Sequence, residues 1–337
     1  HAVRVETRRM GGGFGGKESQ GNPLAVACAV AARATQRPCK MRYDRDDDMM
    51  ITGKRHDFRI TYRVGFAQDG RIAGVSFVHY CRCGWAQDLS LPVADRAMLH
   101  ADNAHHLEHA RIESHRLRQN TQSPTAFRGF GGPQGMTAME RVIDHIAHSL
   151  GRDPVDVRRI NYYDDAAAIT QTQPVAEEVT APVHDAAASR MTTGGNDLAS
   201  RGAADTTRPD SLPIAPPTAQ TTPYGMAVTD FNLHALTDKL LQSSNYHARR
   251  NAIADWNADS PILKRGIAFS PVKFGISFTL THLNQAGALV HVYQDGSIHL
   301  NHGGTEMGQG LFQKVAQVAA ARFGVARDRI RITASDT

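Results

Sequence analysis

Three glycine-rich segments, each followed by a stretch typical of a helix, constrain this chain more than any other feature. They span residues 10–18, 127–134 and 302–310 and read MGGGFGGKE, FRGFGGPQ and HGGTEMGQG. Glycine tolerates positive φ and lets the backbone approach a ligand closely. A helix N-terminus adds unpaired N–H groups and a partial positive charge, which together suit an anion. Three such loops predict one large, flat, anionic ligand held from several sides, because a single phosphate needs only one of them.

Length, charge and cysteine content exclude several classes of protein. A chain of 337 residues, 41% of them hydrophobic and 21% charged, is typical of a globular protein with room for two cores. The net charge of +5 comes from scattered basic residues with few interleaved aromatics, which predicts no nucleic-acid partner. No apolar run reaches about 18 residues, so we expect no membrane span. The four cysteines lack zinc spacing, and we expect reduced thiols.

Alternating apolar residues predict two hairpins. The first pairs residues 58–64 with 72–77 across a Gln-Asp-Gly turn, and the second pairs 289–293 with 298–300 across an Asp-Gly turn. Residues 3–5 also alternate, which predicts a strand directly before the first glycine loop.

Helical periodicity follows each glycine loop. The predicted helices span residues 24–34, 136–150, 154–161 and 311–323. The inward positions are expected to be Met139, Val142, Ile143, Ile146 and Leu150 in the second helix, and Val315, Val318 and Ala319 in the last. Mixed sheets with helices packed on them give an α+β fold class.

One segment differs in composition from the rest of the chain. Residues 166–223 contain no aromatic residue and seven of the fifteen prolines. Such a stretch buries too little apolar area to offset chain entropy, so we predict a disordered low-complexity insertion or linker. It divides a first domain, residues 1–165, from the start of a second, residues 224–337.

The first glycine loop resembles a phosphate-binding P-loop only superficially. The P-loop pattern requires Ser or Thr after its lysine, and here Glu18 follows Lys17. A carboxylate there repels a triphosphate. Glu18 and Arg96 together are able to recognise a polar heterocycle through complementary hydrogen bonds and to stabilise charge on it. Taken singly, each is an ordinary solvated charge.

Aromatic and histidine residues near the loops leave alternatives open. Phe130 and Phe278 lie among small residues, where a ring either stacks on a planar ligand or packs in an ordinary core. Five histidines gather in one part of the sequence with spacing that fits neither a zinc finger nor a His-Glu-x-x-His helix. We expect them on a solvated, loop-rich surface without a metal; they are His100, His105, His106, His109 and His115.

Four segments together resemble one protein family. Residues 11–18, 126–134, 273–279 together with 284–287, and 303–310, in this order, are similar to the molybdenum-binding part of the xanthine dehydrogenase and aldehyde oxidase family of molybdenum hydroxylases. The resemblance covers the chain outside residues 166–223. It implies the family's molybdopterin-binding fold and a molybdenum cofactor whose metal is held by the pterin dithiolene, not by protein side chains.

The resemblance also implies roles for individual residues. Contacts to the cofactor are implied for Gly13, Phe14, Gly15, Arg128, Gly129, Gly308 and Gln309, with Phe14 and Arg128 nearest the metal centre. Glu18 and Arg96 match the catalytic pair that orients a purine. Phe130 and Phe278 match rings that sandwich it, and Thr279 is their polar neighbour. Aldehyde oxidases usually lack both charged residues, which favours hypoxanthine and xanthine over aldehydes.

The implied chemistry is attack of a metal-bound hydroxide on an electron-poor C–H carbon with hydride transfer to a metal sulfide. Electrons would then pass through 2Fe-2S clusters and FAD, on other domains or a partner subunit, to NAD. A cytoplasmic dimer or heterotetramer is expected.

The family's general-base glutamate and an upstream glutamine have no match between His1 and Thr337. We therefore expect a piece of a catalytic subunit that is inactive alone. The alternatives are an aldehyde or N-heterocycle oxidase, or a fragment that keeps only the fold.

Overall fold

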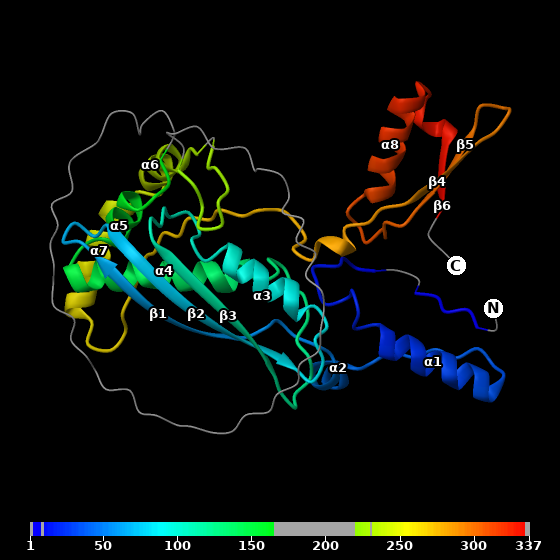
Figure 1. The fold of residues 1–337 in the computed structure, drawn as a ribbon, viewed down its shortest axis with the longest axis horizontal. Coiled ribbons are helices and arrows are strands. Elements are labelled where there is room, and N and C mark those ends of the chain that lie inside the picture. Colours follow the sequence, from blue (N-terminus) through cyan, green and yellow to red (C-terminus); the bar gives the residue numbers. More distant parts are fainter. Residues whose placement is uncertain (1–2, 8–9, 165–219, 230, 334–337) are drawn as a thin grey trace, which may run out of the picture.

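The computed structural model describes residues 3–7, 10–164, 220–229 and 231–333. Most of the segment predicted to be disordered, residues 166–219, lies outside the described residues. Its disorder therefore stays a prediction, as does the division into domains at residues 165 and 224. Within the described residues, the fold combines helices with two mixed sheets, which confirms the α+β class (Figure 1).

The first sheet has the order β1-β2-β3. Strand β1 (Phe58–Phe66) pairs antiparallel with β2 (Ile72–Gly84), which pairs parallel with β3 (Ala110–Arg118). The predicted first hairpin is confirmed, and Gly70 supplies its positive φ of 94° in the turn. Strand β3 was not predicted from the sequence.

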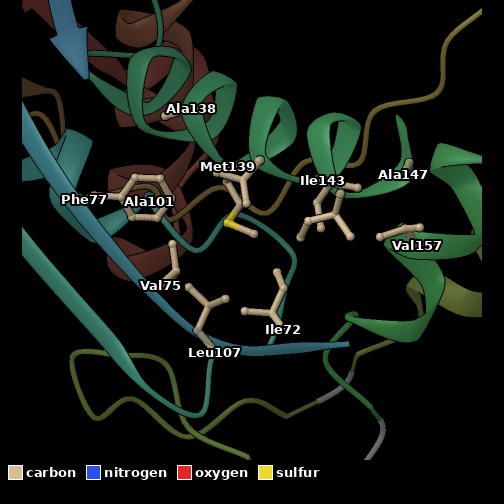
Figure 2. Packing of buried hydrophobic residues seen from close by; sticks show 12 residues of the cluster. Ile72, Val75, Phe77, Ala101, Leu107, Ala138, Met139, Ile143, Ala147 and Val157 are labelled. Atoms are coloured by element: carbon tan, nitrogen blue, oxygen red, sulfur yellow. The ribbon is translucent and has the colours of Figure 1, made fainter. Parts of the chain in front are cut away.

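Helix α4 (Gly132–Leu150) packs across one face of this sheet and forms the main core with it. Figure 2 shows Met139 and Ile143 of the helix pointing toward Val75 and Ile72 of β2. The predicted apolar face is confirmed, although the helix begins at Gly132 rather than at residue 136. Each fully buried side chain of this kind contributes about 1.5–3 kcal/mol relative to its exposed state.

Further helices border this unit. They are α3 (Ser90–Leu99), α5 (Pro154–Ile160), α6 (Leu233–Ser243) and α7 (Tyr246–Asp259). Helix α5 confirms the helix predicted at residues 154–161. Helices α6 and α7 pack on it, because Leu241 and Tyr246 form a buried cluster with Val155. The chain beyond residue 224 therefore first adds to the unit around the first sheet.

The second sheet has the order β4-β5-β6, and helices α5, α6 and α7 lie at the opposite end of the molecule (Figure 1). Its elements are β4 (Ala288–Val292), β5 (Ile298–His302), β6 (Ile330–Thr333), helix α8 (Leu311–Phe323) and two short 3-10 turns, η2 (Thr281–Leu283) and η3 (Arg327–Arg329). Strands β4 and β5 form the second predicted hairpin. The predicted inward face of α8 is partly wrong, since Val318 is 64% exposed. Val315 and Ala319 face the cluster of Ile298 and Leu300 as predicted, and Ala316 and Ala320 join them, so that small side chains let the helix lie close to the sheet.

The N-terminal region differs most from expectation. Residues 3–7 form no strand, so that prediction is wrong. Helix α1 (Asn22–Thr35) confirms the helix predicted at 24–34, but it buries none of its residues. Helix α2 (Arg45–Ile51) was not predicted; the Asp44 side chain caps it by accepting a hydrogen bond from the Asp47 amide at 2.8 Å.

Candidate functional site

The three glycine loops meet in space although they are far apart in sequence. The Gly12 amide donates to the Met307 carbonyl at 2.9 Å, which joins the first loop to the third. Gly15 and Phe127 form an antiparallel bridge, and the Arg128 amide donates to the Phe14 carbonyl at 2.9 Å. The first loop therefore contacts both others, as expected for segments that hold one ligand.

The first two loops share a Gly-Phe-Gly-Gly turn with an uncommon backbone. Phe14 and Phe130 both have positive φ, 52° and 51°. This conformation costs a residue with a side chain about 1–2 kcal/mol, so the surrounding packing must enforce it. The Phe14 side chain is 72% exposed and does not offset that cost by burial. The turn instead brings the Phe14 carbonyl to the Arg128 amide, which joins the first two loops.

Close approach to backbone requires glycine at Gly15 in the first loop, whereas Gly13 lies only against the flexible end of the Met307 side chain. A Cβ at Gly15 would lie 2.4 Å from the Ala126 carbonyl oxygen, and Gly15 has a φ of 84°. A Cβ at Gly13 would lie 2.8 Å from the Met307 sulfur. Gly15, which like Gly13 is expected to contact the cofactor, therefore also allows the loops to contact one another.

The third loop supplies its own anion. Glu306 Oε1 accepts from the amides of Gly308 at 2.9 Å and Gly310 at 3.1 Å, and Oε2 accepts from Phe312 at 3.1 Å. These hydrogen bonds, that of Phe312 above all, lower the pKa of Glu306. Contrary to expectation, the N-terminus of α8 is therefore occupied by a protein carboxylate and is not free for a ligand.

Gln309 closes on its own loop. Its Oε1 accepts from the Met307 amide at 2.6 Å, and its Nε2 donates to the Thr305 carbonyl at 2.9 Å. Gly308 beside it has a φ of 103°. Both predicted cofactor contacts lie in the loop that meets Gly12, and their roles stay predictions.

Arg96 on α3 is a buried cation. It is 2% exposed, and its Nη1 donates to the Gly275 carbonyl at 2.5 Å. The guanidinium carbon lies 5.1 Å from the ring centre of Phe274 and 5.6 Å from that of Phe130. No carboxylate pairs with Arg96 in the described part of the chain, and its Nε lacks a hydrogen-bond partner there. Burial lowers the pKa of Arg96.

The two rings predicted to sandwich a ligand lie against each other. The centres of Phe130 and Phe278 are 5.3 Å apart with an angle of 45° between the planes, which is direct ring contact. The Thr279 hydroxyl donates to the Pro92 carbonyl at 2.7 Å, fixing this segment to α3. The structure thus brings Phe130, Phe278 and Thr279 together around Arg96, and a planar ligand would enter only if the rings part.

Glu18 and Arg128 lie apart from this cluster of contacts. Both are exposed. Glu18 Oε2 accepts from the Lys17 amide at 3.1 Å, and no hydrogen bond or ion pair joins it to Arg96 across the described residues. The Arg128 carbonyl accepts from Arg55 Nη2 at 2.8 Å, a contact that the sequence did not suggest. A Cβ at Gly129, with its φ of 88°, would lie 2.5 Å from the Pro133 ring.

Two histidines contradict the expectation of a solvated cluster. His100 and His105 are buried, whereas His109 and His115 are exposed as expected. His105 Nε2 bonds Glu140 at 2.9 Å inside the core. No group of side chains suited to a metal ion occurs within the described ranges. Sequence spacing missed the burial because it depends on the turn that follows α3.

His100 is the functional-site residue that sequence reasoning missed. Its Nδ1 lies 3.0 Å from the Arg96 carbonyl oxygen, and its Nε2 accepts from the Gly275 amide at 3.1 Å. Nearby, Lys273 pairs with the buried Asp102. The only signal in the sequence is that His100 follows Arg96 by one helical turn, which indicates a shared face and no more.

Comparison with known proteins gives two family matches. A model described as "Molybdopterin cofactor-binding domain" matches residues 1–162, and a second model of the same description matches residues 239–337. Together they cover well over half of the chain. None of the helices in the described ranges combines the length and hydropathy that crossing a bilayer requires.

Curated relatives match the chain throughout. It is 39% identical over 337 residues to xanthine dehydrogenase of Drosophila subobscura, covering 100% of this chain and 21% of that protein. It is 40% identical over 335 residues to xanthine dehydrogenase/oxidase of Gallus gallus, covering 99% and 21%. The chain thus spans about a fifth of the length of the curated relatives it matches.

Solved structures agree in fold. The chain aligns with Cu,Mo-CO dehydrogenase with a TM-score of 0.64 at 18% identity, covering 98% of this chain and 37% of that one. It aligns with aldehyde oxidoreductase from Desulfovibrio desulfuricans with a TM-score of 0.62 at 20% identity, covering 97% and 30%. At these identities the likeness shows a shared fold alone.

Proposed function

The chain belongs to the family of molybdopterin cofactor-binding domains, and on that premise we propose that it is part of a molybdenum hydroxylase that oxidises hypoxanthine to xanthine and xanthine to urate. The identity of about 40% to proteins named xanthine dehydrogenase supports this choice. One observation carries it: Arg96 is a buried guanidinium, flanked by phenylalanine rings, with no carboxylate partner in the described part of the chain. Such a site suits a planar ligand that carries or develops negative charge.

The residues present fit the molybdenum cofactor. Its contacts would come from backbone near Gly13, Phe14 and Gly15, from Arg128 and Gly129, and from Gly308 and Gln309, all on loops that contact one another. When bound, the cofactor supplies the redox chemistry and the oxygen that enters the substrate. For the protein that carries this chain we also propose 2Fe-2S and FAD centres on other domains or a partner subunit, NAD as acceptor, a dimer or heterotetramer, and a cytoplasmic location.

The chain's own residues bind and orient the purine. Phe130 and Phe278, which contact each other directly, would part and hold its plane between them, and Thr279 fixes the Phe278 segment to α3. Arg96 donates to the purine edge and offsets the negative charge that builds up on the ring during attack. Glu18 would accept a hydrogen bond at the opposite edge. Fixing the reacting carbon in one orientation removes part of the entropic barrier to reaction.

An aldehyde oxidase of the same family is the second candidate. Glu18 is exposed and does not contact Arg96 within the described residues, so a shared purine site is not assembled around both groups. An aldehyde needs neither charge for its orientation. A fragment that keeps only the fold is the remaining alternative.

Substitution of the two charged residues separates these candidates. In the molybdenum-loaded protein that carries this chain, we expect Arg96→Met to reduce kcat/KM for xanthine by about 10²–10³, since it removes a donor to developing charge. Glu18→Gln should reduce it less, and aromatic aldehyde turnover should change little in both. The exposed Arg322→Met is the matched control. Equal losses for xanthine and aldehyde would favour the aldehyde oxidase, and wild-type protein with bound cofactor but no turnover would favour the inactive fragment.

A further inference from the structure

Residues 271–279, here called the strap, carry two rings of the candidate purine site without regular secondary structure. They contain Phe274 and Phe278, and both rings contact residues of the first unit. Because helical or sheet hydrogen bonds do not hold the strap, its position depends on side chains of α3 and the turn after it.

The backbone of Gly275 is held at both its N–H and its carbonyl group. Its N–H donates to His100 Nε2 at 3.1 Å, and its carbonyl accepts from Arg96 Nη1 at 2.5 Å. His100 Nδ1 in turn lies 3.0 Å from the Arg96 carbonyl oxygen. Arg96, His100 and Gly275 thus form a closed ring of three hydrogen bonds between α3 and the strap.

This ring fixes the state of the imidazole. A backbone amide only donates, so Nε2 must accept and carry no proton. A carbonyl oxygen only accepts, so Nδ1 must carry the proton. Only the neutral Nδ1–H tautomer of His100 therefore satisfies both partners.

We propose that His100, as the neutral Nδ1–H tautomer, is a positioning residue that clamps the strap to Arg96 and so sets the width of the purine site. The purine ligand in this proposal rests on the proposed function, but the hydrogen-bonded clamp does not depend on it.

The surrounding charges also favour the neutral imidazole. Burial is the main cause that lowers the pKa of His100 from its ordinary 6.5, and the nearby cations Arg96 and Lys273 act in the same direction, whereas the hydrogen bond to the Arg96 carbonyl and the charge of Asp102 oppose them. Protonation would point an Nε2–H at the Gly275 N–H and place a third cation beside Arg96 and Lys273. A histidine whose pKa is lowered by folding loses its stabilising contribution as the pH falls below 6.5, so acid should open the clamp.

Two substitutions at His100 test the clamp. Glutamine reaches the Nε2 position with an oxygen that accepts, whereas asparagine reaches only the Nδ1 position. In the protein that carries this chain, we expect His100→Asn to accelerate amide exchange in residues 271–279 about tenfold, because one hydrogen bond is lost. His100→Gln should stay within about twofold of wild type. The exposed His282→Gln is the control.

Kinetics with xanthine add a second readout. His100→Asn should raise KM about tenfold with a smaller change in kcat, since binding geometry changes more than chemistry. Wild-type kcat/KM should fall below pH 6.5 along a limb that His100→Gln lacks. Unchanged strap exchange in His100→Asn, or equal loosening by Asn and Gln, would overturn the clamp whatever the substrate.

A measurement on the wild-type protein covers the case in which variants fail to fold. Exchange at Gly275, corrected for the intrinsic effect of pH and compared with Val142 in α4, should accelerate as the pH falls from 7 to 5, a range that spans the ordinary histidine pKa of about 6.5. A constant ratio would overturn the proposal. Loosening of the strap in His100→Asn without any turnover of xanthine would retain the clamp and reject the purine function.

Discussion

Replacing Gly15 by alanine should open the junction between the first two glycine loops. Gly15 has a φ of 84°, and its new Cβ would lie 2.4 Å from the Ala126 carbonyl oxygen and from the Phe127 Cα. The positive φ costs about 1–2 kcal/mol for alanine. Forcing a carbon against backbone atoms adds about 1–3 kcal/mol. We therefore expect the junction to be destabilised by about 2–5 kcal/mol.

Native-state hydrogen exchange at Arg128 measures this junction directly, because that amide donates to the Phe14 carbonyl. A loss of about 2–5 kcal/mol corresponds to exchange faster by about 30-fold or more, up to the limit set by the fully open loop. Gly11→Ala is the matched control, since Gly11 has no neighbour within 4 Å of its Cβ position and no positive φ. Equal exchange rates at Arg128 in Gly15→Ala and Gly11→Ala would refute the steric reasoning.

Two further substitutions test charged groups that hold the structure together. Glu140→Ala removes the acceptor of His105 at 2.9 Å and of Arg158 at 2.6 Å, so urea unfolding should show a loss of about 3–5 kcal/mol. Burial alone would raise the pKa of Glu140, but His105 and Arg158 outweigh it and lower the pKa below 4.5. The wild-type protein should therefore lose the stability contributed by ionised Glu140 as the pH falls below 4.5. Glu140→Ala should show no such loss. Glu306→Ala should leave the amides at the start of α8 without their acceptor and so loosen the third glycine loop. Because that loop carries predicted cofactor contacts, the molybdopterin content of the purified protein should fall. Glu306→Gln, which keeps an acceptor, should lower it less. Equal cofactor content in both Glu306 variants would contradict a capping role.

Local patterns predicted the elements whose own residues determine them. The β1–β2 hairpin follows from alternation around Gly70, and α4 follows from an apolar stripe that ends at Gly151 with its φ of 64°. Strand β3 was missed because it pairs parallel with β2, and a parallel pair leaves no turn signal in the sequence. Val318 was wrongly placed on the inward face of α8, and Ala316 and Ala320 were missed, because alanines carry little hydrophobic signal.

Sequence motifs and the family resemblance suggested candidate site residues, whose roles stay predictions, but they did not reveal the long-range contacts. The sequence suggested Arg96, Phe130 and Phe278, and the structure places them together. It did not suggest His100, whose role depends on Gly275, far along the chain. It also assigned the N-terminus of α8 to a ligand. Residue types alone do not show that the loop turns Glu306 back onto the first amides of that helix.

The difference between the two buried arginines is the strongest argument for a ligand at Arg96. Arg158 is as buried as Arg96, yet two carboxylates neutralise it, Glu140 at 2.6 Å and Asp144 at 2.9 Å. Its pKa is raised despite burial, whereas that of Arg96 is lowered. A buried cation without an opposite charge is costly even where a carbonyl and aromatic rings contact it, and the fold avoids this cost at Arg158 with carboxylates of its own. Its persistence at Arg96, among aromatic rings, is explained if the missing negative charge arrives with the substrate.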